Sequence, residues 1–248
     1  MSSKIKFLVI ILIIAIILVY SFTNEDIIGY INFAFSSKND MVVKLYKVNP
    51  QVEKLAAQPS NKLVLKVEVR DTLGKPVPKA RIDLTSSKNI GKVHAASKRT
   101  DNFGEILVEY LPYIDEYSEV KFDTSDITVS AKIHGSQKES SIDIKLIPTP
   151  IIYVHGYLAN ANIFSNLKDY LESEGFTSSA ISYKSEEGVA SSASQLREYI
   201  QNEKKVYLSQ GIQVKQFDLV AHSMGGLVAR YYTSSSDYIL NNDVRKII

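Results

Sequence analysis

Cysteine is absent from the 248 residues, which excludes disulfides, thiol catalysis, thiolate metal sites and a lipid-modified N-terminal cysteine. Histidine is scarce: His94, His134, His155 and His222 are scattered, and none lies at metal-ligand spacing. An excess of either charge is also lacking, since 29 basic side chains stand against 27 acidic ones. We therefore expect no metal, no cofactor and no nucleic-acid partner.

A long apolar run lies near the N-terminus. Residues 7–20, FLVIILIIAIILVY, contain no polar side chain, and Lys4 and Lys6 precede them. Basic residues before such a run remain in the cytoplasm, so residues 1–26 are predicted to be a transmembrane signal anchor with the rest of the chain outside. No A-x-A cleavage pattern follows the run, so an anchor is favoured over a cleaved signal peptide, which would release a secreted protein.

Residues 61–147 have the alternating pattern of β-strands. Leu63, Leu65 and Val67 alternate with residues of the opposite face, and glycine-containing turns separate this run from four similar ones. Short amphipathic strands at this spacing predict an all-β sandwich of two sheets. Residues 27–60 before it form a connecting segment, with strand-like alternation around its middle, that the sequence does not place.

Two motifs within the predicted sandwich resemble a known kind of domain. G-K-P-V-P-K-A at 74–80 and T-D-N-F-G-E at 100–105 are similar to the turns of bacterial immunoglobulin-like repeats of the invasin and intimin type. The resemblance implies a spacer or adhesive module without chemistry of its own. Pro148 and Pro150 then stiffen a linker at 148–150.

Strand and helix patterns alternate from residue 151 to the last residue. Buried strands are predicted at 151–154 and 176–183, and helices at 163–173 and 189–208. A further strand and helix follow. This order predicts a parallel sheet with flanking helices and right-handed connections.

Residues 217–230, FDLVAHSMGGLVAR, change from an apolar strand to helical spacing across a sharp bend that carries Ser223. Such a bend brings the residues two before and two after the serine together, and Ala221 and Gly225 are small enough for this. The following helix starts at the bend, so the amide of Met224 faces the same spot. The pattern predicts an exposed hydroxyl beside an amide that can stabilise an oxyanion.

The motif A-H-S-M-G-G resembles the nucleophile elbow of α/β-hydrolases, and its first alanine is typical of small bacterial lipases. His155-Gly156-Tyr157, after an earlier strand, is similar to the H-G-x oxyanion loop of lipases. The resemblance implies that Ser223 is the nucleophile and that the amides of Tyr157 and Met224 form the oxyanion hole. It gives His155 a structural role, while Gly156 lets the backbone approach.

The family's triad runs in the order serine, acid, histidine, and no histidine follows Ser223. Asp237 and Asp243 are expected to be solvated loop carboxylates, and His222 is expected to pack facing away from the serine hydroxyl. We therefore expect residues 151–248 to be a partial α/β-hydrolase domain, truncated from a longer enzyme and with little turnover by itself.

Two functions follow from these patterns. The first is a serine hydrolase acting on carboxylic esters, lipase-like or carboxylesterase-like, with a lipid-like small molecule as substrate and a tether in the cell membrane. The alternative is a cell-surface binding or adhesive protein whose hydrolase segment is degenerate and whose function lies in the sandwich.

Overall fold

The computed structural model describes residues 40–88, 90–112 and 126–248. The expected anchor at 1–26 and the beginning of the connecting segment lie outside these residues. Within the described ranges, no helix has the length and apolar character needed to cross a membrane.

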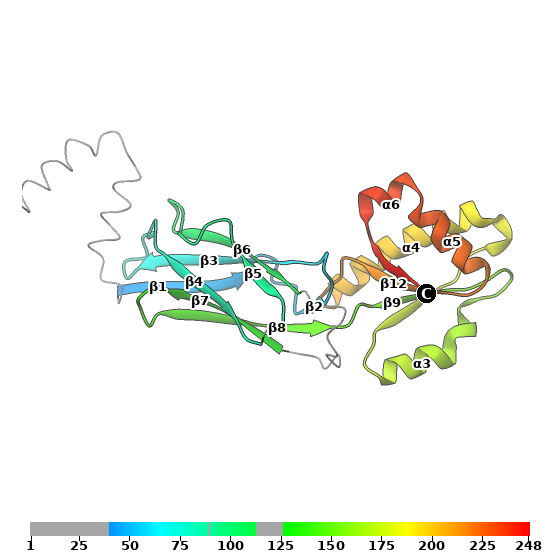
Figure 1. Cartoon of the computed structure of the whole chain (residues 1–248), viewed down its shortest axis with the longest axis horizontal. Helices are drawn as coiled ribbons and strands as arrows, with labels where there is room; N and C mark the ends of the chain where they lie inside the picture. The colour runs from blue at the N-terminus through cyan, green and yellow to red at the C-terminus, as the bar shows by residue number, and fades with distance from the viewer. Residues whose placement is uncertain (1–39, 89, 113–125) are drawn as a thin grey trace, which may run out of the picture.

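A β-sandwich forms the first part of the described chain (Figure 1). One sheet has the order β1-β3-β6-β5, and all its neighbouring strands are antiparallel. The other sheet has the order β11-β2-β8-β7-β4. The strands are β1 (Met41–Lys47), β2 (Lys54–Ala56), β3 (Leu63–Asp71), β4 (Ile82–Ser86), β5 (Lys92–His94), β6 (Glu105–Leu111), β7 (Asp126–Ile133), β8 (Glu139–Ile147) and β11 (Ile212–Gln213).

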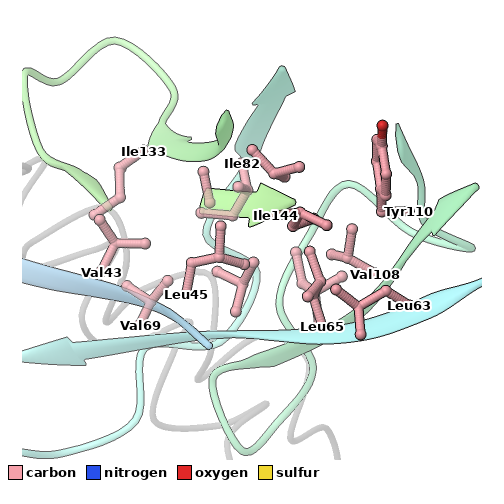
Figure 2. Close-up of a cluster of buried hydrophobic side chains, with 14 of the residues drawn as sticks. Val43, Leu45, Leu63, Leu65, Val69, Ile82, Val108, Tyr110, Ile133 and Ile144 are labelled. Atoms are coloured by element: carbon pink, nitrogen blue, oxygen red, sulfur yellow. The ribbon is translucent and has the colours of Figure 1, made fainter. Parts of the chain in front are cut away.

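The core of the sandwich comes from strict alternation along its strands. In β3, Leu65 and Val67 are fully buried, whereas the residues between them are partly exposed. Because successive side chains of a strand point to opposite faces, each sheet presents one apolar face to the other. Figure 2 shows this packing, with side chains from both sheets directed toward one another, among them Val43, Leu45, Val69, Val108, Ile133 and Ile144.

The sandwich includes strands that precede residue 61. β1 pairs with β3 from Met41 opposite Asp71 to Lys47 opposite Leu65, and its residues Met41, Val43 and Leu45 are buried. β2 pairs in parallel with β8. The alternation noted within residues 27–60 is therefore that of a strand whose paired residues lie 18 to 30 positions further along the chain.

A four-stranded parallel sheet forms the second part, in the order β10-β9-β12-β13. Its core includes Ile152, Leu196, Phe217 and Val228, all fully buried. The elements are β9 (Ile151–Val154), the 3₁₀ helix η2 (Ala161–Phe164), α3 (Ser165–Ser173), β10 (Ser178–Ile181), η3 (Ser185–Glu187), α4 (Val189–Ser209), β12 (Phe217–Ala221), α5 (Met224–Thr233), α6 (Ser236–Asn241) and β13 (Val244–Ile247).

The two parts are joined by more than the linker. β11, which follows α4, adds to the edge of the sandwich sheet beside β2, and the amides of Glu53 and Lys54 donate to the carbonyl of Gly211 (2.7 and 2.9 Å). Ala56 and Ile147 of the sandwich strands pack in the same core as the α/β part. The sandwich and the parallel sheet therefore share hydrogen bonds and apolar packing.

Gln58 makes three side-chain hydrogen bonds across this junction. It is fully buried, its Oε1 accepts from the amides of Lys215 and Gln216 (3.2 and 3.0 Å), and its Nε2 donates to the carbonyl of Gln216. These residues lead directly into β12, the strand before Ser223. Gln58 thus fixes the start of that strand against the sandwich.

Replacing Gln58 by alanine is expected to lower the free energy of unfolding by about 2–4 kcal/mol, because it leaves buried backbone groups without partners. Urea denaturation followed by circular dichroism measures the change. Gln51→Ala is the matched control, since Gln51 is exposed and should cost less than about 0.5 kcal/mol. Equal midpoints for the two variants would contradict the structural role of Gln58.

The direction of the parallel strands fixes where their carboxyl ends lie. β8 is separated from β9 by only residues 148–150, and the two strands follow one another along the long axis in Figure 1. Because β10, β12 and β13 are parallel to β9, their carboxyl ends point away from the sandwich. Ser223 follows β12 at this distal edge, where ligands of open α/β sheets bind.

Candidate active site

Ser223 occupies the bend between β12 and α5. Its backbone angles are φ 54° and ψ −120°, and the residue is exposed to solvent. A non-glycine residue with positive φ is under steric strain, and such strain persists only where the surrounding structure holds it. The bend therefore presents the side chain of Ser223 at the edge of the sheet.

Two glycines allow the backbone to pack tightly around this bend. A Cβ atom on Gly225 would lie 2.2 Å from the carbonyl oxygen of Val154, which no side chain can occupy. A Cβ atom on Gly156 would lie 3.1 Å from the Cβ of Ser223. The loop after β9 therefore lies directly against the serine. Ala221 is partly buried on the other side of the bend.

His155 is buried beneath this loop. Its Nε2 accepts from the amide of Tyr183 (3.2 Å), and its Nδ1 lies 2.8 Å from the carbonyl oxygen of Gly156. The ring stacks on that of Tyr183 with centroids 4.1 Å apart, and the Tyr183 hydroxyl donates to the carbonyl of His155. Burial raises the pKa of Tyr183, which keeps this donor protonated. His155 thus holds the loop in place.

The two amides predicted to form an oxyanion hole belong to the loop after β9 and to the start of α5. Met224 is the first residue of α5, so its amide is one of the four at the helix start without an acceptor inside the helix. Tyr157 follows Gly156, and the next residue, Leu158, has φ 49° and donates its amide to Ser185 Oγ (2.8 Å). Buried Ser185 therefore fixes the course of the loop beyond Tyr157.

The other predicted histidines lie as follows. His222 is exposed rather than packed, because it sits at the open edge of the sheet, and its Nδ1 lies 3.2 Å from the position of a Cβ on Gly156. His94 and His134 are exposed in the sandwich, where His134 Nδ1 lies 2.8 Å from Asp83 Oδ2. Among the described residues, no group of acidic or histidine side chains is arranged to hold a metal ion.

Asp243 is not the solvated carboxylate that the sequence suggests. It is fully buried, accepts from the Tyr232 hydroxyl (2.8 Å) and from Gln201 Nε2 (2.6 Å), and lies 3.6 Å from Lys204 Nζ. Burial, then the bond to Asp243, raises the pKa of Tyr232, and burial lowers the pKa of Lys204. Asp237, by contrast, is half-exposed and pairs with an arginine of α4.

Asp218, which interrupts the apolar strand before Ser223, has a partner that the sequence patterns did not predict. Asp218 is buried, and its carboxylate accepts from both Nε and a terminal nitrogen of Arg245 in β13, with 2.8 Å between Nε and Oδ1. Such bidentate pairs are specific in geometry. An acidic residue inside an apolar strand, followed by an arginine in the strand-like run at 244–248, is the signal that could have revealed it.

The amino-acid sequence was also compared with known proteins. A family model described as lipase (class 2) matches residues 148–239, so the linker and most of the α/β part form a lipase-like segment. That match contains β9, β12, α5 and the bend at Ser223. No curated protein matches the chain.

Several solved structures resemble the chain, with identities of 14–17%. Domains 4 and 5 of the S-layer protein SbsC give a TM-score of 0.31 at 15% identity, with 44% of this chain and 48% of that one covered. The D0–D1 domains of intimin give a TM-score of 0.32 at 17% identity, with 42% of this chain and 46% of that one covered. The D00–D0 domains of intimin give a TM-score of 0.34 at 14% identity, with 46% of this chain and 51% of that one covered. The chain thus spans about half the length of these structures. TM-scores of 0.31–0.34 support no inference about the function of the chain.

Proposed function

We propose that the chain is a serine hydrolase acting on carboxylic esters. Ser223 is the nucleophile, and the amides of Tyr157 and Met224 form the oxyanion hole. The observation that supports this most is the strained backbone of Ser223 at a strand-to-helix bend, with the Gly156 loop packed against it. The lipase-like segment that contains both elements points to the same reaction.

In the proposed reaction, Ser223 Oγ attacks the ester carbonyl carbon, and the carbonyl electrons move to its oxygen. The two amides stabilise this negative charge where it develops. The tetrahedral intermediate then expels the alcohol, which takes up the proton lost from the serine. Attack of water on the acyl-enzyme releases the carboxylic acid and restores the hydroxyl.

Exposed apolar side chains around the bend favour a lipid-like ester. Tyr157 is 60% exposed and Leu158 72% in the loop against Ser223, and Leu227 is 58% exposed in the first turn of α5. A binding site for an acyl chain needs such apolar contacts beside a few polar groups. We also propose that residues 1–26 tether the protein to a membrane, with the lipase-like part outside the cytoplasm.

The histidine expected after Ser223 in the family's order is not among the 248 residues, and His155 does not replace it. His155 has contacts at both ring nitrogens and is buried, so it cannot take a proton from Ser223. No histidine follows Ser223 in the 248 residues. We therefore propose that these residues alone acylate Ser223 slowly, with water carrying the serine proton to the leaving alcohol.

Covalent labelling tests the nucleophile without requiring turnover. A fluorophosphonate should form one Oγ–P bond with loss of fluoride, and peptide mass spectrometry should place it on Ser223. Ser236→Ala, which removes an exposed hydroxyl at the start of α6, should be labelled like the unmodified protein. Labelling of other serines at the same rate, or none at all, would refute the hydrolase proposal and favour an adhesive protein with a degenerate segment.

A further inference from the structure

Two turns of the same form close the end of the sandwich that is remote from the α/β part. Asp71 Oδ1 accepts from the amides two and four residues further on (both 2.9 Å), and Asp101 Oδ1 does the same (2.9 and 2.8 Å). Each turn carries a large apolar residue at its apex. Leu73 is 80% exposed in the first turn, and Phe103 is 71% exposed in the second.

The second turn packs against the residues that flank the first on both sides. The amide of Val69 donates to the carbonyl of Gly104 (2.8 Å), and a Cβ on Gly104 would lie 3.2 Å from the Cα of Pro76. Gly104 has φ 74°, so glycine permits both this backbone conformation and the close approach. The turns at 71–75 and 101–105 therefore form one surface, which we call the sandwich tip.

Positive charge gathers in the segment that joins these turns. Residues 71–105, which include both turns and the segment between them, contain seven lysine and arginine residues and four acidic ones, a net charge of +3, whereas the whole chain has a net charge of +2. Arg81 and Arg99 face one another in a β-bridge, and both are exposed. The amide of His134, at the turn between β7 and β8, donates to the carbonyl of Arg81 (2.9 Å), which brings the exposed Lys138 of that turn to the same end.

The described chain also begins beside this surface. Met41 pairs with Asp71, so residue 40 enters the sandwich next to the turn that carries Leu73. In Figure 1, β1 begins and β3 ends at the end of the sandwich opposite to the α/β part. The sequence that precedes this point contains the apolar run at 7–20, for which a membrane is the expected environment.

We propose that the sandwich tip lies on an anionic lipid bilayer. Apolar side chains that enter the headgroup region, together with nearby cations, are the two signals that stable attachment to a membrane surface requires. A cation close to an anionic membrane strengthens binding about fivefold. Leu73 and Phe103 supply the apolar contacts, and the cations are Lys75, Arg81, Arg99 and Lys138.

A sandwich tip on the bilayer would determine how the lipase-like part is oriented. Because β9 and its parallel neighbours point away from the sandwich, a tip that lies on the bilayer directs Ser223 away from it. The junction at Gln58 makes the two parts one body. The sandwich then works as a rigid support that holds the lipase-like part at a fixed distance from the lipid surface.

A single tryptophan tests the proposal, since the chain contains none. The full chain with Phe103→Trp is placed in nanodiscs of phosphatidylglycerol, and its emission should shift to the blue and lose about half its intensity to brominated lipid. Ile239→Trp is the matched control, because Ile239 is 76% exposed on α6 in the α/β part. Its emission should remain that of a water-exposed indole and resist quenching.

Charge reversal separates tip contact from tethering elsewhere in the chain. Lys75→Glu with Lys138→Glu should remove about half of the quenching at position 103 in anionic nanodiscs. Lys205→Glu, at an exposed position on α4, should leave it unchanged. Equal quenching at positions 103 and 239, or an unshifted emission from position 103, would overturn the proposal and leave the tip available to a protein partner.

Discussion

Ser223→Ala is expected to abolish ester hydrolysis that is assisted by added imidazole. Imidazole can take the role of a general base, which contributes a factor of about 10²–10⁴ in serine hydrolases, so we expect it to accelerate the unmodified protein about 100-fold. The acceleration requires an exposed hydroxyl beside the proposed oxyanion hole, and Ser223 is exposed at the bend. Initial rates with p-nitrophenyl butyrate over a series of imidazole concentrations measure the effect.

Imidazole also cleaves such esters in free solution, and the alanine variant measures that background. Ser236→Ala is the matched control, because it removes another exposed serine hydroxyl and should retain the full acceleration. An acceleration that survives in Ser223→Ala would assign the chemistry to another group. Fast turnover without imidazole would show that a base is already present in the chain.

Gly225→Ala is expected to lower the free energy of unfolding by about 3–5 kcal/mol, which is at the upper end for single substitutions. The new Cβ would lie 2.2 Å from the Val154 carbonyl oxygen and 2.7 Å from that of His155. Both atoms belong to the backbone at the end of β9, so neither can rotate away. Helix α5 would have to move off the sheet, and Ser223 with it.

Gly226 provides the control within the same helix. A Cβ there would meet nothing within 4 Å, and alanine favours helix over glycine by about 1 kcal/mol, so Gly226→Ala should be neutral or stabilising. Chemical denaturation compares the two variants, and fluorophosphonate labelling reports whether Ser223 remains in place. Equal stabilities would mean that β9 and α5 are not packed as closely as described.

The local parts of the structure were accessible from the sequence. Apolar spacing gave α4 at 189–209 within one residue of its predicted end, and β9 exactly as predicted at 151–154. Small residues on both sides of Ser223 indicated the bend, because only small side chains fit where β9 and α5 approach. These features depend on neighbours in the chain or on a single steric requirement.

Contacts between distant residues were not accessible in the same way. β11 is two residues long and pairs with a strand more than 150 residues earlier. A strand of two residues is too short to show an alternating pattern of apolar side chains. Asp243 looks like a loop carboxylate by sequence, and only the packing of α4 and α5 over it provides Tyr232 and Gln201 as partners. Burial of a polar side chain depends on which elements meet, and the sequence alone does not state this.

We propose that Ser223 faces two backbone amides that can stabilise a negative charge. A crystal structure of the full chain after reaction with a p-nitrophenyl phosphonate tests it most directly, because the phosphoryl oxygen takes the place of the oxyanion. We predict an adduct on Ser223 Oγ whose phosphoryl oxygen lies about 3 Å from the nitrogen atoms of both Tyr157 and Met224. A phosphoryl oxygen that points into solvent, out of hydrogen-bond reach of both amides, would contradict the claim.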